Sequence, residues 1–266
     1  MPLFHEIPLH PALKPYIVRL TIADPAEEND AAAPYKVLPG PNPVLGFQYR
    51  GRLATVRENG DALLERSGVT GLQTSSRVFR PDPATRTILV TFRPFGLVPL
   101  AGPLLDQLAN QSVGLDSFIP TLVSRLLEER LGETDDISRL GTTVQGFLLK
   151  LLLESKWQPL QAVIRATELI NKSHGQARIE TIAQEIGWSR RQLERTFQSH
   201  IGLNPKSFAS LTRFDWAAKH LLASSSLVEL AGKAGYADQA HMARRFFLYA
   251  GARPGQFKEN LALPSL

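Results

Sequence analysis

Two short segments near the C-terminus carry side chains that could read the edges of base pairs. The eight candidates are Arg190, Arg191, Gln192 and Arg195 in the first segment and Gln239, His241, Arg244 and Arg245 in the second. An arginine fork matches guanine O6 and N7, and a glutamine amide matches the adenine edge. We therefore expect Arg191, Arg195, Gln239, His241 and Arg244 to face bases. Arg190 and Arg245, together with Lys206 and Arg213, are expected to contact phosphates or to pack.

The two segments belong to one pattern that occurs twice. Gly187 and Gly235 are 48 residues apart, and Phe197 and Phe246 are 49 residues apart, so one residue is inserted in the second copy. A repeat of fixed period usually reflects one supersecondary unit used twice. Each copy predicts a helix, a glycine turn and a second helix, which is the arrangement of a DNA-reading helix-turn-helix.

Capping residues define where the second helix of each copy begins. Gly187 and Gly235 are expected to end the first helices, because glycine readily adopts the left-handed conformation found there. Ser189 then caps a helix over residues 190–200, and Asp238 caps one over residues 239–249. In the second of these helices Met242, Phe246 and Phe247 are predicted to form the buried side.

A longer helix is predicted between the two units, from Asn204-Pro205 to about Ala223. Asn204 is a suitable cap, and proline at the first helical position loses no hydrogen bond. Such a helix would hold the units at a fixed separation. If both recognition helices enter one face of a duplex, they must lie roughly 34 Å apart and read successive major-groove segments.

Residues 1–94 are rich in β-branched and aromatic runs bounded by Pro and Gly. Strands are predicted over 16–23, 44–49, 69–73 and 87–92, and Asn59-Gly60 predicts a hairpin between 53–57 and 62–66. This spacing is typical of a small barrel or sandwich. Residues 26–34 are an acidic, alanine-rich loop.

Two helices are predicted after the strands, with apolar residues on one face over 119–131 and 137–152. They either pack on the strands, which we favour, or form a dimer interface. Residues 156–159 are a plausible linker. The predicted fold class is therefore α+β with two domains: residues 1–155, a small β-barrel plus helices, and residues 160–260, an all-α domain with two helix-turn-helix units.

Positive charge is concentrated in the C-terminal part of the chain. Residues 1–157 contain 16 Lys and Arg against 17 Asp and Glu, a net charge of −1, whereas residues 158–266 contain 14 against 8, a net charge of +6. A basic excess on the repeat-bearing part is what binding to phosphates requires.

Composition also excludes several classes of protein. The chain has no cysteine, so disulfides, thiolate metal sites and thiol nucleophiles are excluded. The start of the sequence lacks the features of a secretory signal, and no run of 18 apolar residues occurs. We expect a cytoplasmic protein that does not interact with membranes.

Residues 160–260 resemble the DNA-binding domain of AraC/XylS-type bacterial transcription regulators. The positions that carry the resemblance are Ile182-Ala183, Gly187, Leu193, Arg195, Phe197, Gly202, Arg213, Ala218, Leu230-Ala231, Gly235-Tyr236, Asp238-Gln239, Phe246, Gly251 and Pro254. The resemblance implies seven helices and sequence-specific DNA binding. Residues 1–155 are similar to an uncharacterised, cupin-like domain that precedes this module, on the basis of residues 37–39, 71–72 and 92–96. That similarity implies a domain that senses a small molecule or dimerises.

The preferred hypothesis is a transcription regulator that is not an enzyme and needs no cofactor or metal. Its partners would be double-stranded DNA, with a small-molecule effector, RNA polymerase and a second copy of the chain as further candidates. One alternative is a ligand-independent regulator whose N-terminal domain serves dimerisation or a protein partner. A cupin-type metalloenzyme is remote, because the N-terminal half has only His5 and His10 as imidazole ligands.

Overall fold

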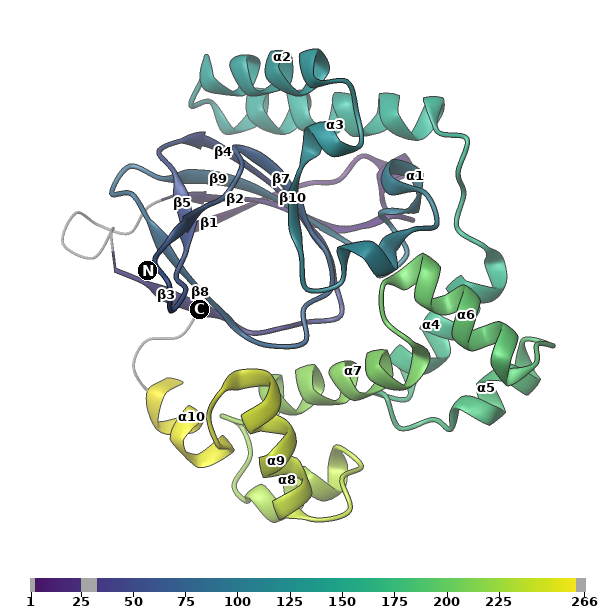
Figure 1. The fold of residues 1–266 in the computed structure, drawn as a ribbon. Helices are drawn as coiled ribbons and strands as arrows, with labels where there is room; N and C mark the ends of the chain where they lie inside the picture. Colours follow the sequence, from purple (N-terminus) through teal and green to yellow (C-terminus); the bar gives the residue numbers. More distant parts are fainter. Residues whose placement is uncertain (1–2, 25–32, 262–266) are drawn as a thin grey trace.

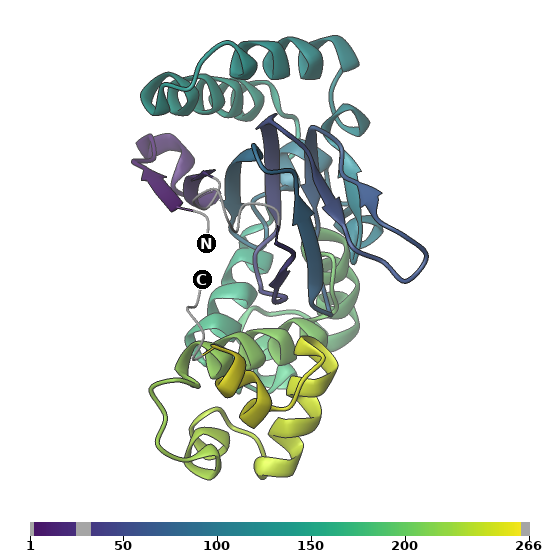
Figure 2. The same ribbon diagram turned by 90° about the vertical axis from the view of Figure 1, so that its left-hand side faces the viewer.

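The fold was analysed in a computed structural model, which describes residues 3–24 and 33–261. Most of the acidic loop expected over residues 26–34 lies outside the described residues. Figure 1 shows a strand-rich N-terminal part above a helical C-terminal part, and Figure 2 gives the same division from the side.

Two antiparallel sheets form the N-terminal part. The larger has six strands in the order β1 (Leu3–Ile7), β2 (Ile17–Asp24), β9 (Arg86–Phe92), β4 (Val44–Arg50), β7 (Ser67–Thr70) and β10 (Ser112–Gly114). The smaller has four strands in the order β3 (Tyr35–Val37), β8 (Arg77–Pro81), β5 (Leu53–Thr55) and β6 (Ala62–Leu63). Leu45, Phe47, Ile88 and Val90 are almost completely buried in the middle of the larger sheet.

The predicted strand-rich domain is confirmed, but the prediction of a closed barrel needs correction. Among the described residues the strands form two separate sheets, and β1 and β10 remain the edges of the larger one. The physical reason lies in strand length, because β3, β5 and β10 have three residues and β6 has two. Strands this short offer too few backbone groups to join the two sheets into one hydrogen-bonded cylinder.

The predicted hairpin is confirmed by β5 and β6, in which Ala54 pairs with Leu63 and Thr55 with Ala62. Gly60 in the connecting turn has φ +106°, a conformation that favours glycine. The ranges predicted for β2, β4 and β9 agree with the structure to within one residue at each end.

Helix α2 (Thr121–Gly132) and helix α3 (Ile137–Glu154) cover one side of the larger sheet, as the top of Figure 1 shows. Leu140, Val144 and Leu148 of α3 are buried there, and the ring of Phe147 meets that of Phe47 edge-on at 6.5 Å. Packing on the strands accounts for only half of the predicted apolar face of α2. Its Leu122, Val123 and Leu126 remain 68%, 41% and 49% exposed.

Seven helices follow within the described residues: α4 (Gln161–Lys172), α5 (Ile179–Glu185), α6 (Arg190–Ile201), α7 (Pro205–His220), α8 (Leu227–Lys233), α9 (Gln239–Ala250) and α10 (Pro254–Leu261). Their core contains Phe197, Phe208, Phe214 and Phe246, all fully buried. Rings from the two repeat units meet rings of α7, with Phe197 5.5 Å from Phe208 and Phe246 5.0 Å from Phe214. Helix α7 therefore joins the cores of both units.

The two parts of the chain pack against each other. Leu72 and Phe95 from the N-terminal part belong to the buried cluster of the C-terminal helices. The amide of Ser76 donates to the carbonyl of Tyr249 at 2.7 Å, and Lys36 Nζ donates to the carbonyl of Ala250 at 3.3 Å. These contacts hold the C-terminal end of α9 against the N-terminal part. The domain limits of 1–155 and 160–260 remain a prediction.

Candidate nucleic-acid interface

The two copies of the repeat build the same turn. The amide of Trp188 donates to Ala183 and that of Tyr236 donates to Ala231, both at 2.9 Å. Gly187 and Gly235 adopt left-handed φ values of +71° and +73° in these turns. Matching hydrogen bonds and matching φ values mean that both copies present their second helix in the same local way.

Side-chain caps start both of these second helices where the sequence predicted them. The Ser189 hydroxyl accepts from the amide of Gln192 at 3.2 Å, and an Asp238 oxygen accepts from the amide of His241 at 2.6 Å. Each helix ends at a left-handed glycine, Gly202 or Gly251. Both helices are therefore fixed at each end.

On α6 the side chains of Arg191, Gln192 and Arg195 are exposed, while Leu193 and Phe197 are buried. Arg190 is exposed as well, but its guanidinium lies between two carboxylates. It is 2.7 Å from Glu180 and 2.9 Å from Glu194, which raise its pKa. Within the described ranges, three of the four predicted residues of α6 therefore present polar groups without an ion-pair partner, and the fourth is already paired.

On α9 the side chains of Gln239 and Arg244 are exposed, and those of His241 and Arg245 are partly buried. The His241 ring meets the buried Tyr236 edge-on at 5.3 Å. The prediction that Phe247 shares the buried side of α9 is wrong, since Phe247 is 63% exposed. Two successive residues of a helix point 100° apart, and Phe246 already takes the inward position.

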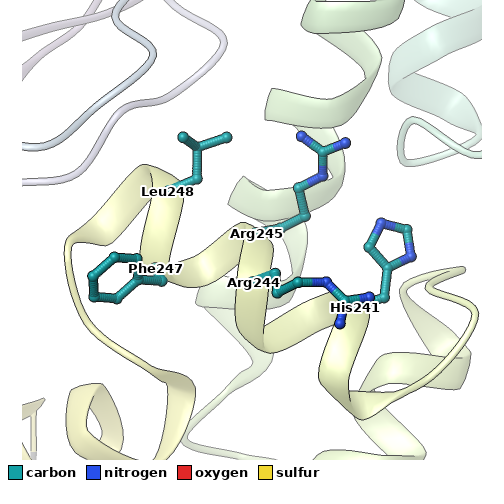
Figure 3. A pocket seen from close by; sticks show the side chains of 5 residues that line it. All are labelled: His241, Arg244, Arg245, Phe247 and Leu248. Atoms are coloured by element: carbon teal, nitrogen blue, oxygen red, sulfur yellow. The ribbon is translucent and has the colours of Figure 1, made fainter.

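A shallow hollow of about 560 Å³ lies over the outward surface of α9. It is lined by His241, Arg244, Arg245, Phe247 and Leu248. In Figure 3, His241 lies at one end of this row and the two apolar side chains at the other, with the two arginines between them. The α9 surface thus combines cationic and apolar groups.

Among the described residues, carboxylates of the domain neutralise Arg190 but not the other arginines of the recognition helices. Six carboxylates from residue 158 onward pair with other cations: Glu168 and Glu185 with Arg165, Glu180 and Glu194 with Arg190, Asp215 with Lys219 and Glu229 with Lys233. In the described part of the chain, Arg191, Arg195, Arg244 and Arg245 have no carboxylate within ion-pair distance. These four arginines leave a net positive surface that suits phosphates.

Arg213 of α7 packs inside the domain, which was one of the two roles predicted for it. Its guanidinium donates to the carbonyls of Gly235 at 3.0 Å and of Gly175 at 2.7 Å, and it lies 5.6 Å from the centre of the Tyr236 ring. It thereby ties the turn of the second unit to the segment that precedes the first. Lys206, by contrast, is exposed at the start of α7.

Tyr236 carries a buried hydroxyl for which the described residues provide no hydrogen-bond partner. Burial is the main cause that raises its pKa from 10.0 to about 12. Because the folded state retains the phenolic proton more tightly than the unfolded chain, the protonated phenol favours the fold relative to the ionised form. This advantage is fully present below pH 10 and is lost as the pH rises from 10 to about 12.

We expect the substitution Tyr236→Phe to leave stability at neutral pH unchanged or to raise it by up to ~1 kcal/mol, since it removes an unpaired buried hydroxyl. The variant should also lose part of the alkaline destabilisation between pH 10 and about 12. Urea unfolding across this range measures both effects. A large loss of stability at neutral pH would show that the hydroxyl has a partner after all.

The two N-terminal histidines have local structural contacts. His5 Nε2 lies 3.2 Å from Asp24, and His10 Nδ1 accepts from the amide of Ala12 at the start of a short 3-10 helix, Pro11–Leu13. Among the described residues no three His, Asp or Glu side chains are grouped so that they could hold a metal ion. Over the ranges 3–24 and 33–261 that the structure describes, no helix is long and apolar enough to cross a bilayer.

The fold is that of a two-domain protein: a strand-rich N-terminal domain is followed by a helical domain that contains two helix-turn-helix units. Residues 182–260 match the model of a helix-turn-helix domain family, and residues 5–114 match a domain of unknown function, DUF6597. The chain is 30% identical over 166 residues to an uncharacterised HTH-type transcriptional regulator of Haemophilus influenzae, covering 62% of this chain and 53% of the relative. It is 31% identical over 88 residues to the probable transcription factor PqrA of Proteus vulgaris, covering 33% of this chain and 72% of PqrA.

Among solved structures, ToxT of Vibrio cholerae matches with a TM-score of 0.48 at 13% identity, covering 92% of this chain and 98% of ToxT. The match to the helix-turn-helix domain family and the sequence identity to the Haemophilus regulator and to PqrA show that the chain belongs to the AraC-type helix-turn-helix transcription regulators. The chain is also 27% identical over 150 residues to the HTH-type transcriptional regulator MtrA of Neisseria gonorrhoeae, covering 56% of this chain and 46% of MtrA. It therefore spans about half the length of the Haemophilus relative and of MtrA.

Proposed function

We propose that this chain binds specific promoter DNA as a regulator, with α6 and α9 in successive major-groove segments of one duplex. The observation that carries the proposal is that both helices share the same turn, while Arg195 and Arg244 occupy equivalent positions, are exposed and are unpaired among the described residues. Base contacts are assigned to Arg191, Arg195, Gln239, His241 and Arg244, and backbone contacts to Arg245 and Lys206.

Selection of binding sites from random duplexes tests this function. The expected result is enrichment of a site with two conserved segments about one helical turn apart. The N-terminal part should remain present, since Leu72 and Phe95 contribute to the core of the C-terminal helices. Equal binding to all sequences would contradict the proposed base contacts.

Arg190 and Arg191 should affect the salt dependence of binding differently. Arg191 is unpaired in the described residues, whereas Arg190 is already neutralised by Glu180 and Glu194. We expect Arg191→Gln to relax the preference for the base that Arg191 contacts and, because an unpaired positive charge is lost, to reduce the slope of log affinity against log salt by up to about 1. Arg190→Gln should leave the slope nearly unchanged. Titrations at several salt concentrations measure this, and a larger change for Arg190 would mean that its ion pairs open on DNA.

A small-molecule effector is proposed for the N-terminal domain. Alternate residues of β4 and β9, including Val44, Gly46, Leu89 and Thr91, are only half-buried, while their neighbours Leu45 and Val90 are completely buried. This incompletely packed face of the larger sheet is where we place the effector. A ligand that binds the folded state must raise the melting temperature, so a thermal-shift screen of metabolites tests it.

A regulator without a ligand is the second candidate, favoured by the exposed apolar side chains Leu122, Val123 and Leu126 on α2. In that case the N-terminal domain would serve a second copy or a protein partner. A chain that stays monomeric at high concentration in ultracentrifugation would count against the dimer. We propose no enzymatic activity, cofactor or metal for either candidate.

A further inference from the structure

The second recognition helix has an apolar end that its DNA-binding role does not by itself explain. Phe247 and Leu248 are 63% and 56% exposed, and both line the hollow on α9 together with Arg244, Arg245 and His241. Apolar side chains of this size are costly to expose to water, and neighbouring ones on a functional helix indicate a binding surface.

The first recognition helix differs at the same positions. The 49-residue offset that matches Phe197 with Phe246 also matches Gln198 with Phe247 and Ser199 with Leu248. Polar residues are therefore compatible with this helix position and its packing. The apolar pair belongs to the second unit alone and is not required by the fold of the repeat.

The apolar pair is fixed on the outward side of α9. The next two residues, Tyr249 and Ala250, are buried, and their carbonyls accept hydrogen bonds from Ser76 and Lys36. The helix cannot rotate to bury Phe247 or Leu248 without breaking these contacts. Leu248 follows Arg244 by one turn, about 6 Å along the axis, so both lie on the same ridge. One turn earlier on this ridge is Ala240, whose small side chain permits close approach to a partner.

The chemistry around the pair decides what it contacts. The three other residues of the hollow are two arginines and a histidine, so a partner must present negative charge and small apolar groups close together. The major groove offers both, because thymine projects a C5 methyl group among base edges flanked by phosphates.

We propose that Phe247 and Leu248 contact thymine methyl groups and make this unit select thymine beside the bases read by Arg244. The proposal rests on the DNA-binding function given above. It assigns the second half-site a requirement for thymine that the first unit, with Gln198 and Ser199, does not impose.

Replacement of single thymines by deoxyuridine tests the proposal, because only the methyl group is removed. In the duplex selected by the native 266-residue chain, one or two replacements in the half-site under α9 should each weaken binding about fourfold, the effect of burying one methyl group. The variant Phe247→Gln combined with Leu248→Ser, which copies α6, should bind the thymine and deoxyuridine duplexes equally. Leu153→Gln is the matched control, since Leu153 is an 87% exposed apolar residue on α3.

Each other outcome has a distinct meaning. If no deoxyuridine duplex binds more weakly while the native chain still selects a sequence, the methyl contact is wrong and the DNA-binding function stands. If the double variant keeps its sensitivity to deoxyuridine, other residues read the methyl groups and the assignment is overturned. If the variant loses only transcriptional activation, the pair contacts a protein instead. If the native chain selects no sequence, the proposed function itself fails.

Discussion

Replacing both Arg195 and Arg244 with alanine should abolish sequence-specific binding while the protein stays folded. Each substitution is expected to cost ~1–3 kcal/mol of binding free energy, because each removes one bidentate base contact. The two sites lie on separate helices, so the losses should add and lower the affinity roughly a thousandfold. Binding curves on the selected duplex measure the loss. Selection with each single variant should show relaxed preference in one half-site only.

Arg165→Ala is the matched control for this pair. Arg165 is also an exposed arginine of the helical part, but it pairs with Glu185 at 2.6 Å and lies on α4, outside both recognition helices. We expect its loss to change affinity little. If the control weakens binding as much as the double variant, affinity depends on net charge alone and neither Arg195 nor Arg244 reads a base.

Local sequence signals predicted the helical part well, because its caps and turns depend on neighbouring residues. Ser189, Asn204 and Asp238 all cap the helices expected of them. Each of these hydrogen bonds joins residues three positions apart, and such contacts can be inferred from spacing. For the same reason the limits of α6 and α9 agree with the predicted ranges to within one residue.

Contacts between distant residues could not be predicted in this way. The ion pair of Arg190 with Glu180 depends on how α5 packs against α6. Arg213 donates to the carbonyls of Gly175 and Gly235, which are 60 positions apart in the sequence. The sequence offered Arg213 as either a phosphate contact or a packing residue, and only the packing of α7 decides between these.

Errors in the N-terminal part have a related cause. The alternation of strand residues predicts which strands exist, but not whether their edges meet, and the two sheets remain separate. Apolar periodicity likewise placed Leu122 and Leu126 on a packing face, although α3 and the sheet cover only the neighbouring Leu127 and Leu131. In the C-terminal part, the apolar character of Phe247 predicts burial, but Phe246 takes the inward position on α9 and Phe247 is exposed.

Arg213→Met should destabilise the protein more than the arginine substitutions described above for the recognition helices. Each hydrogen bond from a charged group contributes ~1.5–3 kcal/mol, so the loss of both bonds should lower the free energy of unfolding by ~3–6 kcal/mol. Methionine fills a similar volume, so the effect comes mainly from the lost hydrogen bonds and from two carbonyls left without them. Urea unfolding of the full chain measures the change.

Arg213→Lys separates charge from geometry at this position. A lysine keeps the positive charge, but a single ammonium group does not reproduce the fork that reaches Gly175 and Gly235 together. We therefore expect the lysine variant to lose at least half as much stability as Arg213→Met. Its DNA binding should also tolerate a wider range of spacing between half-sites, because the second turn is no longer tied to the segment before the first unit. Full stability in the lysine variant would mean that positive charge alone, and not the two-carbonyl contact, holds this part of the domain together.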